Sequence, residues 1–119
     1  MMPFDRFTQR AQEAIAQSQE ILQRYKHSQL DAEHLLLALI EQPGGVIPQL
    51  LDKLGADVEV IRERLDDHLS TTPPTQFGPA APQAQIYVTP RVKRIIDVAI
   101  EESKRLGDDY VSTEHIFLA

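Results

Sequence analysis

Two threonine–glutamate pairs share one spacing in this sequence of 119 residues. Glu33 follows Thr8 by 25 residues, Glu114 follows Thr89 by 25 residues, and a histidine comes directly after each glutamate. If each threonine caps one helix near the start of the next, Thr8 and Glu33 would share one polar pocket, and Thr89 and Glu114 a second. A carboxylate beside a hydroxyl group suits a basic ligand, above all a planar guanidinium. The spacing therefore predicts two equivalent sites for a basic group.

The same residues have a structural interpretation as well. Glu33 and Glu114 each come two residues after a predicted helix cap, where a carboxylate stabilises the positive end of the helix dipole. His34 and His115 would then pack beside the cap and form local hydrogen bonds. The spacing leaves both interpretations open for the glutamates, whereas the histidines are expected to be structural.

The residue sets needed for catalysis or cofactor binding are missing. The sequence has no cysteine, no G-x-x-x-x-G-K-[ST] phosphate loop, and no serine or threonine in a nucleophile elbow. Its four histidines, at positions 27, 34, 68 and 115, do not follow the spacing of metal ligands. We therefore expect this chain to have no enzymatic activity of its own, no metal and no cofactor.

An internal repeat places the two pairs at matching positions. Residues 7–38 align without a gap on residues 88–119 at a constant offset of 81, with 9 identities in 32 positions. Most other aligned positions exchange one apolar residue for another. A repeat of this length is a supersecondary unit that is used twice.

The apolar spacing within each repeat predicts helices and no strand. The predicted helices run from Thr8 to about Tyr25, from Ala32 to about Glu41, from Val46 to Leu54, from Asp57 to Leu69, from Pro90 to Leu106, and onward from Ser112. The helix that begins at Ala32 is apolar nearly all round, through Leu35, Leu36, Leu37, Leu39 and Ile40, which predicts that it is buried at the centre. The predicted buried stripe of the helix that begins at Pro90 is formed by Val92, Ile95, Ile96, Ala99 and Leu106. We therefore expect an all-α fold of two pseudo-symmetric repeats, 7–69 and 88–119, the second one truncated. The segment 70–87 between them is rich in proline and glycine and is expected to be a mobile inter-repeat loop.

The charge and hydropathy of the chain exclude some classes of binding partner. The net charge is −6 and the sequence pI about 5.1, without a basic stripe, so nucleic acid is not an expected partner. No apolar run approaches the roughly 20 residues that cross a membrane, and the first residues do not resemble a signal peptide. We expect a cytoplasmic protein that binds neither nucleic acid nor membranes.

Several motifs together resemble the Clp N-terminal repeat, the domain that begins the Clp/heat-shock AAA+ unfoldases. The motifs are Asp31-Ala32-Glu33-His34-Leu35-Leu36-Leu37-Ala38-Leu39, Tyr110-Val111-Ser112-Thr113-Glu114-His115-Ile116-Phe117-Leu118-Ala119, Phe7-Thr8, Gly44-Gly45…Leu50-Leu51…Gly55 and Thr89-Pro90-Arg91. The resemblance implies an eight-helix pseudo-dimer of which this chain lacks most of the last three helices. The segments 41–45 and 106–111 favour a ClpB-type disaggregase over a ClpC-type protease unfoldase, with which the Thr89-Pro90-Arg91 motif is shared.

The resemblance also implies functional residues. In ClpB-type domains, the positions that match Thr8, Asp108 and Glu114 are implicated in handling aggregated substrate. In ClpC-type domains, polar pockets such as those expected at Glu33 and Glu114 are implicated in recognising phosphorylated arginine. The expected binding residues are therefore Thr8, Glu33, Thr89, Asp108 and Glu114.

The function implied is capture of substrates or adaptors for an ATP-dependent unfoldase. Expected partners are unfolded or aggregated proteins and adaptor proteins; the parent would be a homohexamer that holds ATP and Mg²⁺ elsewhere. The alternatives are a phosphoarginine-binding ClpC-type domain and a freestanding helical scaffold. An apolar groove between the repeats is a further candidate surface, since Val98, Ile100 and Phe117 do not share the buried stripe of their neighbours; alternatively these residues pack against the missing helices.

Overall fold

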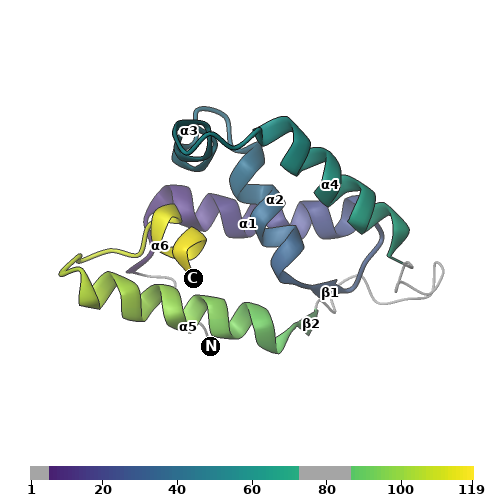
Figure 1. Ribbon diagram of the computed structural model, residues 1–119. Helices are drawn as coiled ribbons and strands as arrows, with labels where there is room; N and C mark the ends of the chain where they lie inside the picture. The colour runs from purple at the N-terminus through teal and green to yellow at the C-terminus, as the bar shows by residue number, and fades with distance from the viewer. Residues whose placement is uncertain (1–5, 73–86) are drawn as a thin grey trace.

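The computed structural model describes residues 6–72 and 87–119, and within these it is built from helices (Figure 1). The elements are α1 (Gln9–Arg24), β1 (Gln29–Leu30), α2 (Ala32–Glu41), α3 (Val46–Lys53), α4 (Val58–Thr71), β2 (Tyr87–Val88), α5 (Pro90–Arg105) and α6 (Thr113–Leu118). The all-α prediction is confirmed.

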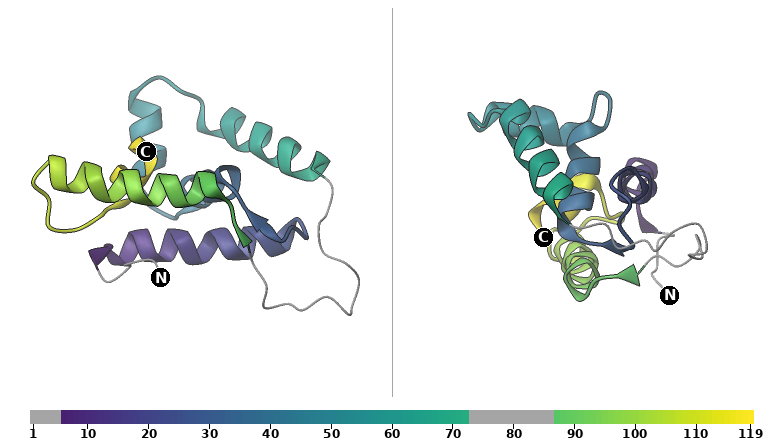
Figure 2. Two further views of the ribbon diagram at one scale, coloured as in Figure 1. Left: turned by 90° about the horizontal axis from the view of Figure 1, so that it is seen from below. Right: turned by 90° about the vertical axis from the view of Figure 1, so that its right-hand side faces the viewer.

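Helix α2 forms the centre of the molecule and contacts all five other described helices (Figures 1 and 2). It is apolar nearly all round, as the sequence predicted, and its buried side chains are those of His34, Leu35, Leu37, Ala38, Leu39 and Ile40. An apolar helix of this kind is stable only when it is covered on most sides. The surrounding helices supply that cover.

Helices α1 and α5 begin and end at equivalent positions of the two repeats. Thr8 and Thr89 cap them, each accepting a hydrogen bond at Oγ1 from the amide three residues later. Two residues after the end of each helix comes a residue with positive φ, Lys26 at 58° and Gly107 at 74°. At each of these helix ends two hydrogen bonds close a Schellman-type turn, which reverses the chain toward the second helix of the same repeat.

The two repeats are joined by short parallel pairings of their backbones. In each pairing, the segment that leads into the second helix of one repeat bonds to the segment that precedes the first helix of the other repeat. Leu30 pairs with Val88, and Phe7 pairs with Val111. These two pairings are related by the offset of 81, since Phe7 matches Val88 and Leu30 matches Val111. They make α1 and α5 run in opposite directions (Figure 2).

Three details differ from the sequence predictions. No strand was predicted, yet β1 and β2 form a ladder, because two residues are too short to show an alternating pattern. Helix α4 continues to Thr71, past the predicted end at Leu69, where the hydroxyl groups of Thr71 and Thr72 bond to the His68 carbonyl. Residues 73–86, most of the predicted mobile loop, lie outside the described residues.

Leu106 was predicted to lie on the buried stripe of α5 but is 50% exposed. Its counterpart in the first repeat, Tyr25, packs against a small cluster that includes Leu37 of α2 and Leu69 of α4. Leu118, which matches the buried Leu37, is also exposed. The second repeat therefore presents to solvent, in the part of the chain that the structure describes, the face that α4 covers in the first.

Candidate functional site

One cluster of polar side chains surrounds the start of α2. Asp31 caps this helix, and its Oδ1 accepts a hydrogen bond from Thr89 Oγ1 at 3.2 Å. The Arg91 guanidinium lies 3.7 Å from Asp31 Oδ1 and 3.8 Å from Glu33 Oε1. His68 Nε2 lies 3.1 Å from the other oxygen, Glu33 Oε2. The carboxylates are thus surrounded by donors from α4 and α5, and the expected basic group is already supplied by Arg91.

The predicted pairing of threonines with glutamates within one repeat is wrong. Thr89, not Thr8, donates to Asp31, and Arg91 of the helix that Thr89 caps lies beside Glu33. Thr8 lies at the other end of α1, where its amide donates to the Val111 carbonyl at 2.9 Å. The 16-residue helix α1 is about 24 Å long and separates Thr8 from the start of α2. Each threonine therefore faces the second helix of the other repeat.

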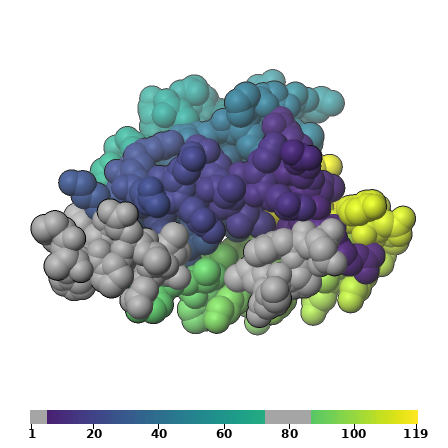
Figure 3. Space-filling view, turned by 180° about the vertical axis from the view of Figure 1, so that it is seen from behind, coloured from purple at the N-terminus to yellow at the C-terminus, as the bar shows by residue number. Residues whose placement is uncertain are grey.

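A second polar cluster surrounds the start of α6. This part of the chain contacts α1, and Figure 3 shows atoms of the C-terminal part, in yellow, next to those of the first described residues, in purple. Asp108 Oδ2 accepts a hydrogen bond from His115 Nε2 at 2.8 Å. The half-buried Glu114 accepts one from the Thr113 hydroxyl, and among the described residues it has no ion-pair partner. Arg10, the counterpart of Arg91, instead donates to the Pro43 carbonyl. The two acidic sites therefore differ: Glu33 faces Arg91 and His68, whereas Glu114 has no ion-pair partner among the described residues.

The two histidines form local hydrogen bonds beside the helix caps, as predicted, and the structure shows that these bonds complete capping boxes. The Asp31 amide donates to His34 Nδ1 at 3.0 Å, and the Ser112 amide donates to His115 Nδ1 at 2.8 Å. In each ring Nδ1 is therefore the acceptor, so the neutral form carries its proton on Nε2. Burial, followed by the charge of nearby His27, lowers the pKa of His34. Both histidines are structural in this arrangement.

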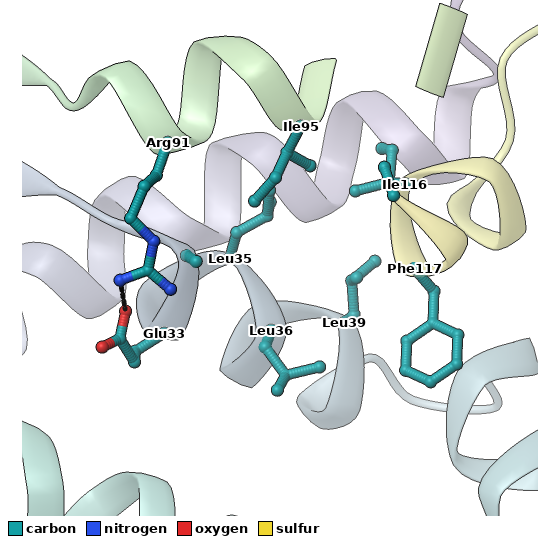
Figure 4. Close-up of a pocket in the computed structure, with 10 residues that line it drawn as sticks. Glu33, Leu35, Leu36, Leu39, Arg91, Ile95, Ile116 and Phe117 are labelled. Atoms are coloured by element: carbon teal, nitrogen blue, oxygen red, sulfur yellow. Dashed lines mark ion pairs between the residues drawn. The ribbon is translucent and has the colours of Figure 1, made fainter. Parts of the chain in front are cut away.

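An apolar pocket of about 290 Å³ opens between α2, α5 and α6 (Figure 4). Its walls are Ala32, Glu33, Leu35, Leu36, Leu39, Arg91, Ile95, Ile116, Phe117 and Ala119. Figure 4 shows the Glu33–Arg91 ion pair at one end and the Phe117 ring at the other. We call this site the α2–α5–α6 pocket.

The sequence predicted this pocket only in part. Of the three residues proposed for an apolar groove, Phe117 lines it, whereas Ile100 packs against the core and Val98 lies in a neighbouring hollow. Leu36 and Leu39 were assigned to the core and were missed as lining residues. The sequence feature that could have indicated these lining residues is that α2 is apolar on more sides than a helix that buries a single face requires.

Within residues 6–72 and 87–119, no group of three or more His, Asp or Glu side chains could hold a metal ion. None of the described helices is long and apolar enough to cross a membrane.

Comparison with known proteins places the chain in a family. Residues 6–119 match the profile described as the Clp repeat (R) N-terminal domain. The chain belongs to this family. It is 40% identical over 116 residues to the chaperone protein ClpB of Nitratidesulfovibrio vulgaris, a match that covers 98% of this chain and 13% of that relative. It is 36% identical over 118 residues to the negative regulator of genetic competence ClpC/MecB of Bacillus subtilis, covering 98% of this chain and 14% of that protein.

Solved structures share the fold. The N-terminal domain of Hsp104 from Candida albicans superposes with a TM-score of 0.82 at 23% identity, covering 96% of this chain and 72% of that one. The N-domain of ClpV, solved in a complex with a VipB peptide, superposes with a TM-score of 0.77 at 16% identity, covering 99% of this chain and 70% of that one. The chain thus spans about an eighth of the ClpB relative and most of the isolated N-domains.

Proposed function

We propose that this domain captures polypeptide segments for an ATP-driven unfoldase of the ClpB type. The observation that carries the proposal is the α2–α5–α6 pocket, which presents apolar walls to solvent in a domain of the Clp N-terminal family. Apolar side chains are what an unfolded or aggregated protein exposes and a folded protein buries. The pocket would therefore select non-native chains, while the Glu33–Arg91 ion pair at its end accepts their polar backbone.

The relatives support a role in binding proteins. A related N-domain, that of ClpV, was solved with a peptide bound. The whole-protein features belong to the proposal: a homohexameric parent, an ATPase with Mg²⁺ in another domain, and a cytoplasmic location. Six copies on one ring would multiply a weak contact at each pocket into useful capture. The division into repeats 7–69 and 88–119 is part of the same proposal, supported by the matched caps of α1 and α5.

The pocket is tested with a short fluorescein-labelled peptide rich in leucine and phenylalanine and without net charge. Leu36→Ser and Phe117→Ser each remove apolar surface from the wall, and we expect each to raise the Kd roughly tenfold, or about 1.4 kcal/mol. Leu54→Ser is the matched control, because Leu54, the C-cap residue of α3, is 71% exposed and does not line this pocket. Unchanged binding in both pocket variants, with circular dichroism showing an intact fold, would exclude this pocket as the capture site.

A second candidate function rests on the difference between the two acidic sites. Glu114 has no ion-pair partner among the described residues, whereas Arg91 faces Glu33. A carboxylate in this state suits a guanidinium-containing ligand, as the ClpC-type alternative requires. Under this alternative, Glu114→Gln weakens binding of an arginine-containing peptide but not of its alanine counterpart, and Glu33→Gln does not. Equal loss for both peptides would instead favour the apolar pocket.

A further inference from the structure

A second hollow adjoins the α2–α5–α6 pocket. It has a volume of about 250 Å³ and is lined by Arg91, Arg94, Ile95, Val98 and Ala119. Arg91, Ile95 and Ala119 line the pocket as well. Figure 4 shows the side chains of Arg91 and Ile95 pointing from α5 toward α2. The pocket and this hollow, which we call the α5 hollow, are therefore adjoining parts of one surface.

The α5 side of this surface combines positive charge with apolar side chains. Arg91, Arg94, Ile95 and Val98 follow the spacing i, i+3, i+4, i+7, which places them on one face of the helix. The two arginines come first, and Val98 lies about 10 Å further along the helix axis than Arg91. A polypeptide segment bound along this face contacts guanidinium groups and apolar groups together.

The two guanidinium groups differ in their partners. That of Arg91 lies 3.7 Å from Asp31 Oδ1 and 3.8 Å from Glu33 Oε1, so two carboxylates already offset its charge. Arg94 is exposed, and among the described residues its side chain has no ion-pair or hydrogen-bond partner, Asp97 one turn later on α5 included. Its planar fork of N–H donors is therefore available to a carboxylate of a ligand.

We propose that Arg94 makes capture selective for apolar segments that carry a neighbouring Asp or Glu. The apolar side chains occupy the α2–α5–α6 pocket, and the carboxylate binds the Arg94 guanidinium in the α5 hollow. Because Ile95 lines both sites and is next to Arg94, the acidic residue lies within a few positions of the apolar ones. This inference rests on the proposed function, since it assigns a substrate class to the same pocket.

The charge of the whole chain separates this selectivity from general attraction. The net charge is −6, so the molecule as a whole repels an acidic peptide. Charges more than about 8 Å apart are largely screened at physiological ionic strength, whereas a direct contact with Arg94 is not. Exposed ion pairs are weak, and we expect this one to tighten binding by about threefold. A preference for an acidic peptide therefore has the opposite sign to the effect of the net charge.

The test uses the 119-residue chain and three fluorescein-labelled peptides that share one run of leucine and phenylalanine. They differ only in the residue beside the run, which is Glu, Gln or Lys. In fluorescence polarisation at neutral pH, the Glu peptide should bind the wild type about threefold more tightly than the Gln peptide. Arg94→Gln should abolish this preference and leave the Kd of the Gln peptide within about twofold of the wild-type value.

Lys93→Gln is the matched control, because it removes the same charge from the adjacent residue, and Lys93 lines neither the pocket nor the α5 hollow. It should keep the preference for the Glu peptide. Arg94→Glu is a second variant that reverses the charge, and it should favour the Lys peptide over the Glu peptide. The two variants of Arg94 change an exposed side chain, so urea denaturation should show an unchanged fold.

The outcomes separate this proposal from the proposed function. If the Gln peptide binds and Leu36→Ser weakens it, but the Glu peptide binds no more tightly, the proposed function stands and selection by Arg94 is refuted. If none of the peptides binds, both fail. A preference that Lys93→Gln reduces as much as Arg94→Gln would also overturn the proposal. So would a wild-type dimer that dissociates in Arg94→Gln on sedimentation, because a second copy would then occupy the α5 hollow.

Discussion

Lys26 is the one described non-glycine residue with positive φ, and replacing it with glycine should stabilise the protein. Its φ of 58° belongs to the left-handed region, which costs a residue with a Cβ atom about 1–2 kcal/mol. Glycine avoids this cost but loses about 0.5–1 kcal/mol more backbone entropy on folding. The difference predicts that Lys26→Gly raises the free energy of unfolding by about 0.5–1 kcal/mol.

The second repeat supplies the reverse experiment at the matching position. Gly107 has a φ of 74°, and a Cβ atom built there has no atom within 4 Å apart from those of Gly107 itself and its two chain neighbours. Gly107→Ala therefore creates no clash, and its expected cost of about 0.5–1 kcal/mol is purely conformational. Lys26→Ala is the control for the side chain, because alanine and lysine have the same left-handed penalty; it should change stability by less than about 0.3 kcal/mol.

Urea denaturation followed by circular dichroism measures all three variants, provided that their m-values agree. For a chain of this size, 1 kcal/mol corresponds to a shift in Tm of about 3–5 °C. If Lys26→Gly proves destabilising, or if Lys26→Ala is as stabilising as Lys26→Gly, the left-handed conformation is not what limits stability at this turn and the reasoning is refuted.

Two further comparisons use matching positions of the repeats. Leu37→Ala removes a side chain that is 1% exposed and should lower the free energy of unfolding by about 2–5 kcal/mol in a urea titration. Leu118→Ala, at a residue that is 63% exposed, should lower it by less than about 0.5 kcal/mol in the same titration. Equal losses would contradict the burial of Leu37 and the exposure of Leu118. Thr8→Ala and Thr89→Ala each remove a helix cap and should cost about 0.5–2 kcal/mol by thermal unfolding. Thr89→Ala should cost more, because Thr89 also donates to Asp31, and the opposite order would argue against that hydrogen bond.

Helix positions and caps could be predicted from the sequence because they depend on neighbours a few residues away. Thr8, Thr89 and Asp31 lie next to the amides they cap, and these assignments are confirmed. The apolar residues of α2 likewise predicted a central helix, because a helix that is apolar nearly all round is stable only when other elements pack over it. The repeat identified the family, as the match over residues 6–119 confirms.

The partners across the molecule were decided by the tertiary structure. Thr89 bonds to Asp31 across 58 residues, and Arg6 bonds to the Asp109 carbonyl across 103. Identical spacing in the two repeats permits either pairing of threonine with glutamate. The short parallel ladder between β1 and β2 and the isolated bridge between Phe7 and Val111 select the crossed pairing, and no local pattern in the sequence reveals either contact. The hydrogen bond between His27 and the Thr72 carbonyl depends on tertiary contact in the same way, since the two residues are 45 positions apart and meet only when α4 folds back along α2.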